Sequence, residues 1–231
     1  MKTPPTMNVT FSSADGTMTG GYLATPDGDG PHPAVIMIHE WWGLNEDVTI
    51  LADALAAEGY VVLAADAYRG ELGTSVAQAL SLTRSIPVEQ IRADLDGALS
   101  FLLANEAVDP KRIGSMGFCF GGRESMHLGI RSPELAAVVT LYGSGPVTDP
   151  SELGYLGSNG PVLGIFGEKD NSIPLKEVEA VGAALDKLGA ENTITVYPEV
   201  GHAFVKSSTY QDDGAAGQAW AELVAFFDQA L

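Results

Sequence analysis

The sequence is poor in cysteine and in basic residues. Its 231 residues include one cysteine, Cys119, so the chain has neither an internal disulfide framework nor a cysteine-rich zinc site. Lysine and arginine together number 12 against 30 aspartates and glutamates, for a net charge of −18. A field of that sign repels phosphate backbones, and we therefore expect no nucleic-acid partner.

Long apolar runs are missing as well. No window approaches the roughly 18 uncharged apolar residues that a spanning helix needs, so we expect no membrane partner. The first residues carry no apolar stretch behind Lys2, unlike a secretory signal peptide, and we expect a cytoplasmic protein. The chain has no Gly-Lys-Ser/Thr phosphate loop, no Gly-x-Gly-x-x-Gly fingerprint and no His-Glu-x-x-His zinc helix, so no metal and no organic cofactor is implied.

The composition is that of a folded chain, with 45% hydrophobic and 18% charged residues. The sequence has no repeat and no linker, so we predict one domain over residues 1–231. Met7–Ser12 and Met18–Ala24 flank a turn signal and predict an antiparallel hairpin. Further strands are expected at Ala34–Ile38, Val61–Ala65, Ile113–Phe118, Ala137–Leu141, Val162–Phe166 and Thr193–Tyr197. Helices are expected at Val48–Glu58, Val88–Asn105, Glu124–Ile130, Leu175–Leu188 and Ala215–Ala230. This alternation predicts an α/β fold, a mostly parallel sheet with helices on both faces.

In such sheets ligands lie beyond the carboxyl ends of the strands, and one strand ends in a nucleophile motif. Gly117-Phe118-Cys119-Phe120-Gly121-Gly122 has the pattern of the nucleophile elbow, with cysteine where serine is commoner. A helix N-terminus favours the thiolate of a cysteine placed there. The motif therefore predicts that Cys119 is a nucleophile, although a lone cysteine is more often an inert core residue.

A base and an acid follow two later strands. Asp170 comes after Val162–Phe166, and His202 comes after Thr193–Tyr197. The order nucleophile, acid, base is that of α/β-hydrolases, so we predict a Cys119–His202–Asp170 triad. Among the other histidines, His39 precedes the nucleophile and is expected to make structural hydrogen bonds.

The loop after Ala34–Ile38 is where this fold supplies an oxyanion-hole amide. We assign the two amides of such a hole to Trp41 and Phe120. Glu40, in the same loop, is a candidate to accept the thiol proton. Arg69 and Lys206 are candidates to bind an anionic group of a substrate, although a loop cation is more often simply solvated.

Together these pieces resemble the dienelactone hydrolase family. The matching segments are His39-Glu40-Trp41-Trp42-Gly43-Leu44-Asn45, Asp66-Ala67-Tyr68-Arg69-Gly70, the cysteine elbow, Gly167-Glu168-Lys169-Asp170 and Gly201-His202-Ala203-Phe204. The resemblance implies an α/β-hydrolase fold and hydrolysis of an enol-lactone by a Cys-His-Asp triad. It also implies that Glu40 takes the Cys119 proton and that Arg69 helps to hold a substrate carboxylate. The family's well-studied enzymes carry a second arginine where this chain has Lys206.

We therefore predict a cysteine hydrolase of lactones or carboxylic esters that works through a thioester. Its small-molecule substrate would contact Arg69, Lys206, Trp42, Tyr68 and Phe204, and the protein would be a monomer or a homodimer. One alternative keeps this site and attacks phosphotriesters. Two others belong to different classes, a thiol redox enzyme and a non-catalytic small-molecule-binding module. The lack of a second cysteine counts against the redox enzyme, and the intact triad counts against the binding module.

Overall fold

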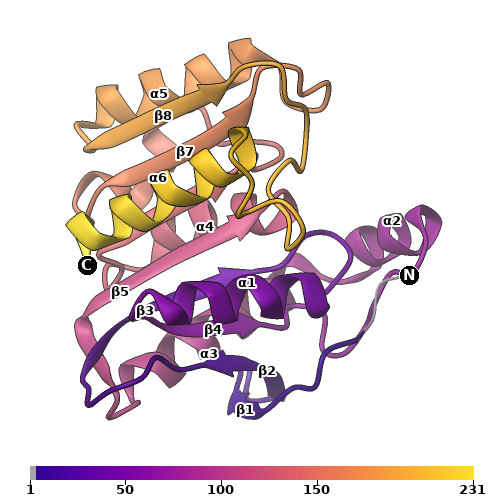
Figure 1. The fold of residues 1–231 in the computed structure, drawn as a ribbon, viewed down its shortest axis with the longest axis vertical. Helices are drawn as coiled ribbons and strands as arrows, with labels where there is room; N and C mark the ends of the chain where they lie inside the picture. The colour runs from indigo at the N-terminus through magenta and orange to yellow at the C-terminus, as the bar shows by residue number, and fades with distance from the viewer. Residues whose placement is uncertain (1–3) are drawn as a thin grey trace. The chain divides into compact units, whose positions relative to one another are not determined.

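The computed structural model describes residues 4–231, and the chain divides into two compact units at Ile113 and Gly114 (Figure 1). A single domain over residues 1–231 stays a prediction. Across residues 4–231, none of the helices has the length and apolar character needed to cross a membrane.

The first unit is built on four strands in the order β1-β2-β4-β3. These are β1 (Val9–Ser12), β2 (Met18–Ala24), β3 (His32–Ile38) and β4 (Val61–Ala65). The β1–β2 and β2–β4 pairs are antiparallel, whereas β3 and β4 are parallel. All of β4 and the last five residues of β3 are buried, which explains their continuous apolar sequences. The predicted N-terminal hairpin is confirmed.

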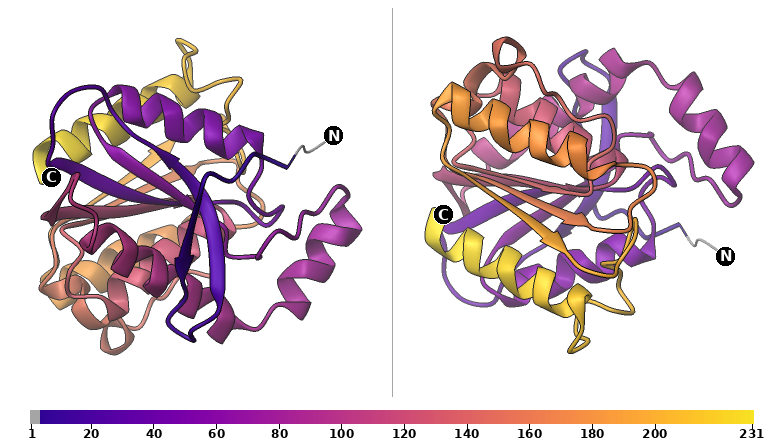
Figure 2. Two further views of the ribbon diagram at one scale, coloured as in Figure 1. Left: turned by 90° about the horizontal axis from the view of Figure 1, so that it is seen from below. Right: turned by 90° about the horizontal axis from the view of Figure 1, so that it is seen from above.

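Two helices cover opposite faces of this sheet, α1 (Glu46–Ala57) and α3 (Val88–Leu103) (Figure 2). Asn45 caps α1, since its side chain accepts a hydrogen bond from the amide of Asp47. A further helix, α2 (Val76–Ser85), is absent from our prediction. Ala79 is its one buried residue, so α2 lacks the apolar stripe by which a helix is recognised in a sequence.

The second unit carries four parallel strands in the order β5-β6-β7-β8. These are β5 (Val108–Phe118), which runs in from the first unit, β6 (Ala137–Leu141), β7 (Val162–Gly167) and β8 (Asn192–Tyr197). Helices α4 (Phe120–Arg131) and α5 (Leu175–Leu188) cover one face, and α6 (Ala215–Ala230) covers the other (Figure 2). Two short 3-10 helices, η1 (Pro150–Glu152) and η2 (Gly154–Gly157), lie between β6 and β7. The predicted mostly parallel α/β fold with an N-terminal antiparallel hairpin is confirmed.

Two predicted boundaries are wrong by four or more residues, and the others agree within two. Helix α4 begins at Phe120 rather than at the predicted Glu124. The prediction missed its first turn because Gly121 and Gly122 have a low helix propensity. Glycine is needed there, since a Cβ atom on Gly122 would lie 2.8 Å from the carbonyl oxygen of Leu141. Strand β5 begins at Val108 rather than Ile113, although its first half is polar and contains a proline.

His39 is fully buried between the ends of β3 and β4. Its Nδ1 lies 2.6 Å from the carbonyl oxygen of Glu40, and its Nε2 accepts a hydrogen bond of 3.2 Å from the amide of Ala67. An amide can only donate, so Nε2 is unprotonated and the proton is on Nδ1. Burial lowers the pKa of this imidazole, while the carboxylate of Asp66, 3.8 Å from Nε2, opposes that shift. The expected structural role of His39 is confirmed.

Acidification should therefore destabilise the fold through His39. Its pKa is lower in the folded state than the value of about 6.5 in the unfolded chain, so stability is full above pH 6.5 and is lost as the pH falls below it. Denaturant unfolding of the wild type and of His39→Gln, measured from pH 7.5 to 5, tests this. The wild type should lose more stability over that range than the variant, and equal losses would contradict the assignment.

Candidate active site

Cys119 lies at the sharp turn between β5 and α4, with backbone angles φ 55° and ψ −109° that side-chain-bearing residues rarely adopt. The turn is held by backbone hydrogen bonds. The Cys119 amide donates to Leu141 O at 3.0 Å, and the Cys119 carbonyl accepts from the amides of Arg123 and Ser144 at 3.1 and 3.3 Å. A Cβ atom on Gly117 would lie 2.1 Å from the oxygen of Gly121, so the elbow requires that glycine.

The half-buried thiol of Cys119 occupies the N-cap position of α4. The positive end of a helix dipole stabilises negative charge at this position. Phe120 is the first residue of α4 and is buried, and its amide belongs to the same helix end. This geometry suits both an anionic sulfur and a charge that develops on a bound carbonyl oxygen.

Asp170 follows β7 and presents its two carboxylate oxygens to different partners. Oδ1 accepts hydrogen bonds from the amides of Ser172 and Ile173 at 2.7 and 3.2 Å. Oδ2 lies 2.6 Å from Nδ1 of His202. The side chain of Asp170 is buried, whereas that of His202 is 26% exposed. With Nδ1 donating to the carboxylate, Nε2 of His202 is left as the basic nitrogen.

The two loops that carry Asp170 and His202 are fastened to each other. The amide of Glu168 donates to the carbonyl of Tyr197, and the amide of Lys169 donates to that of Val200, both at 2.8 Å. Glu199, in a left-handed conformation, donates its amide to the Glu168 carboxylate at 3.0 Å and forms an ion pair with Lys169. These contacts fix Asp170 and His202 relative to each other.

Tyr142 is a residue that the sequence analysis missed. It follows β6, has a φ of 40°, and its fully buried ring packs edge-on against the imidazole of His202, with centroids 5.2 Å apart. Its hydroxyl donates to the carbonyl of Val205 at 3.1 Å. The residue before it, Leu141, accepts the hydrogen bond from the Cys119 amide. Tyr142 thus connects the turn at Cys119 with the loop that carries His202. Its place directly after a buried strand was the available signal.

Two predicted substrate-binding residues lie beside His202 in the second unit. Phe204 is half-buried, and its ring contacts those of Tyr142 and Tyr197 with centroids 5.6 Å away in each case. Lys206 is exposed, and its backbone amide and carbonyl are engaged by the turn that contains Thr209.

The remaining predicted residues belong to the first unit. Glu40, Trp41 and Trp42 follow β3 and are half-buried, and the two indole rings meet edge-on with centroids 5.1 Å apart. The Glu40 carbonyl accepts hydrogen bonds from His39 Nδ1 and from the amide of Gly43. Tyr68 is 1% exposed, and its ring packs edge-on against His39.

Arg69, by contrast, binds carboxylates of its own unit. Its Nε and Nη2 atoms bind the buried Asp94 of α3 at 2.9 and 2.7 Å, and Nη2 also binds Asp15 of the hairpin turn at 2.8 Å. The hydrogen bond from Arg69 lowers the pKa of Asp15. This geometry favours a structural role for Arg69, which ties the β1–β2 turn to α3.

No group of three or more His, Cys, Asp or Glu side chains within residues 4–231 is placed to hold a metal ion. The second unit instead carries a thiol, an imidazole and a carboxylate after its strands, with the imidazole bound to the carboxylate. Such a set can perform nucleophilic and general-base chemistry.

Comparison with known proteins identifies the family of this chain. The model of the dienelactone hydrolase family matches residues 19–231. The chain belongs to the dienelactone hydrolase family. It is therefore a hydrolase of carboxylic esters or lactones, and the prediction made from the sequence is confirmed at that level.

Individual members of the family are similar over most of the chain. The "Putative carboxymethylenebutenolidase" of Escherichia coli K12 is 34% identical over 228 residues, which cover 90% of this chain and 81% of that protein. A solved "Putative Dienelactone Hydrolase" from Klebsiella pneumoniae is 31% identical, has a TM-score of 0.79 and covers 96% of this chain and 100% of its own. A dienelactone hydrolase-like promiscuous phosphotriesterase from metagenomic libraries has a TM-score of 0.85 at 23% identity, covering 97% of this chain and 98% of its own. That last likeness concerns the fold alone.

In this hydrolase, Tyr142→Phe should distinguish the role of the hydroxyl, which bonds to Val205, from that of the ring, which packs on His202. Loss of the bond to Val205 leaves a carbonyl without its partner and should lower the free energy of unfolding by about 1–3 kcal/mol. The ring against His202 is kept, so kcat for a small aryl ester should stay within about threefold of the wild type. Chemical denaturation and steady-state kinetics measure the two effects. A large fall in kcat with unchanged stability would contradict this division of roles.

Proposed function

We propose that Cys119 is the nucleophile of a lactone or carboxylic-ester hydrolase, with His202 as its base and Asp170 as the orienting acid. The observation that carries this proposal is the 2.6 Å contact between Asp170 Oδ2 and His202 Nδ1, in the same unit as a cysteine held at a nucleophile elbow. A carboxylate that is itself fixed by two backbone amides suits the role of orienting the imidazole.

The reaction proceeds in two halves. Nε2 of His202 takes the proton of the Cys119 thiol. The thiolate attacks the carbonyl carbon, and the carbonyl π electrons move to the oxygen. The tetrahedral intermediate then collapses, the bond to the leaving oxygen breaks, and that oxygen receives a proton from His202 Nε2. The product of this half is a thioester on Cys119. A water molecule, deprotonated by Nε2, hydrolyses the thioester, releases the carboxylic acid and restores the cysteine.

Further roles are carried from the sequence and from the family resemblance. The amide of Phe120 is proposed to hold the oxyanion, and Trp41 is proposed to supply a second amide. Glu40 is proposed as the alternative to His202 as acceptor of the thiol proton, and Lys206 as a contact to an anionic group of the substrate. Phe204, Trp42 and Tyr68 stay predicted substrate contacts. The proposal does not depend on Arg69, because two carboxylates already engage its guanidinium.

Replacement of the nucleophile gives the first test. Cys119→Ala should abolish hydrolysis of p-nitrophenyl acetate above the rate of the uncatalysed reaction, since no thioester can form. Mass spectrometry of the wild type quenched during turnover should find an acetyl group on Cys119. Cys119→Ser serves as the control for folding, because it keeps the size of the side chain. Wild-type turnover by Cys119→Ala would refute the assignment.

The acid is tested by Asp170→Asn, with Asp186→Asn on the exposed end of α5 as the matched control. An amide at position 170 favours the wrong tautomer of His202, so kcat should fall by about 10³- to 10⁴-fold while folding is kept. The control should stay within about twofold of the wild type. Steady-state kinetics with p-nitrophenyl acetate gives both values, and similar rates for the two variants would contradict the triad.

The alternatives predict different products at the same sulfur. A phosphotriesterase would form a phosphoryl adduct on Cys119 with paraoxon, and it would hydrolyse paraoxon faster than the aryl ester. A thiol redox enzyme would consume peroxide with an external thiol faster than it hydrolyses esters. A binding module would be stabilised by esters that it never converts. Any of these results would replace the proposed esterase or lactonase function.

A further inference from the structure

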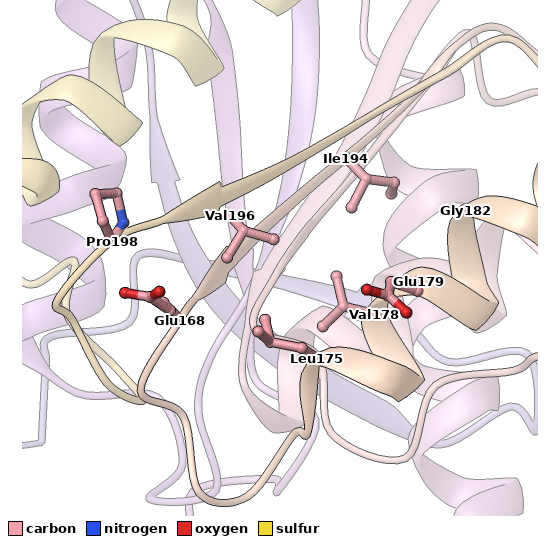
Figure 3. A pocket seen from close by; sticks show the side chains of 8 residues that line it. All are labelled: Glu168, Leu175, Val178, Glu179, Gly182, Ile194, Val196 and Pro198. Carbon is pink, nitrogen blue, oxygen red and sulfur yellow. The ribbon is translucent and has the colours of Figure 1, made fainter.

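A hollow lies between β8 and α5 and reaches the loops that carry Asp170 and His202. It is a groove of about 420 Å³ lined by Glu168, Leu175, Val178, Glu179, Gly182, Ile194, Val196 and Pro198 (Figure 3). Leu175 and Val196 remain 41% and 38% exposed, so the groove has an uncovered apolar surface. Carboxylates of Glu168 and Glu179 flank the apolar side chains on two sides (Figure 3).

The groove borders an open strand edge. β8 is the last strand of the sheet order and pairs with β7 on one side. The carbonyl of Glu191 accepts a hydrogen bond from Val162 of β7, and that of Tyr197 accepts one from Glu168, directly after β7. The odd-numbered residues of β8 therefore direct their backbone groups toward β7. Because backbone direction alternates along a strand, the N–H and C=O groups of Ile194 and Val196 point to the outer edge.

The same two residues point their side chains into the groove. Thr195 and Tyr197 face the opposite side of the sheet, where both hydroxyls bond to Glu222 of α6. Ile194 and Val196 alternate with them and therefore face α5. An added strand at this edge would hydrogen-bond to the backbone of β8 and lay every second side chain over the groove.

Nothing in β8 protects this edge from pairing. Its sequence, Asn-Thr-Ile-Thr-Val-Tyr, carries no charge and is rich in residues that favour strands. Gly182 leaves room above α5: a Cβ atom there would make ordinary contact with Ile194 Cγ1 at 3.4 Å, so packing does not require a glycine. Glycine inside a helix costs about 1 kcal/mol relative to alanine. At position 182 the missing side chain keeps the groove open.

We propose that this groove and strand edge bind an extended peptide segment of a partner protein, in which apolar residues alternate and basic residues flank them. The apolar side chains would fill the groove, and the basic ones would meet Glu168 and Glu179. Charge favours such a partner over a second copy of this chain, because each copy carries a net charge of −18. The proposal is independent of the chemistry at Cys119.

The probe is a fluorescein-labelled seven-residue peptide with lysine at positions 1 and 7, valine at 3 and 5, and threonine between them. Fluorescence anisotropy should show saturable binding to the full-length protein. The same peptide with glutamate in place of lysine, or with N-methyl groups on alternate backbone amides, should bind at least about tenfold more weakly. Absence of saturable binding by the lysine peptide up to about 1 mM would overturn the proposal.

Protein variants locate the binding. Gly182→Leu fills the groove and should weaken binding at least about tenfold, whereas Ala183→Leu, exposed on the same helix, should change it less than about twofold. Glu179→Gln should weaken it about threefold and reduce its salt dependence, and Glu177→Gln, also exposed on α5, should not. Circular dichroism melts confirm folding. Equal effects of the two leucine variants would overturn the proposal.

Val196→Pro tests the backbone, because it removes an outward N–H and spares the bonds to β7. It should abolish peptide binding. Sedimentation velocity should give the same oligomeric state for the wild type and for Val196→Pro. A dimer of the wild type that dissociates in this variant would assign the edge to a second copy and refute the peptide proposal.

Discussion

The positive φ of Cys119 is the constraint on which the proposed catalytic arrangement depends. Such a conformation costs about 1–3 kcal/mol and persists where its surroundings impose it. Here the surroundings are the hydrogen bonds to Leu141, Arg123 and Ser144, together with glycines that let β5 and α4 approach. Relaxation of this residue would move the sulfur off the helix N-terminus and so remove the electrostatic support for a thiolate.

The other proposed catalytic groups are held by comparable means at neighbouring strand ends. Asp170 and His202 follow β7 and β8, and the ladder of contacts from Glu168 and Lys169 to Glu199 and Val200 joins their loops. Tyr142 follows β6 and supports the imidazole from one side. The parallel sheet of the second unit thus places the proposed nucleophile, acid and base and a supporting ring after four adjacent strands. In this class of fold, ligands bind beyond the carboxyl ends of the strands.

Sequence patterns predicted the parts of this protein that local physics determines. Buried strands such as Val61–Ala65 have continuous apolar runs, and the elbow at Cys119 needs small residues at fixed offsets, so both could be read directly. The early start of α4 was hidden because its glycines serve packing rather than helix propensity. Tyr142 and the partners of Arg69 depend on contacts between residues distant in the chain, and no local pattern encodes such contacts.

The turn between β1 and β2, at one edge of the sheet, is bound to α3. At β1, the guanidinium of Arg69 joins the hairpin turn at Asp15 to Asp94 on α3, and the amide of Ala14 donates to the carbonyl of Ala93 on the same helix. Three segments that are remote in the chain are thereby fastened at one cation. Their amide protons should consequently exchange with solvent in a single cooperative opening, so that fraying of the hairpin alone is suppressed.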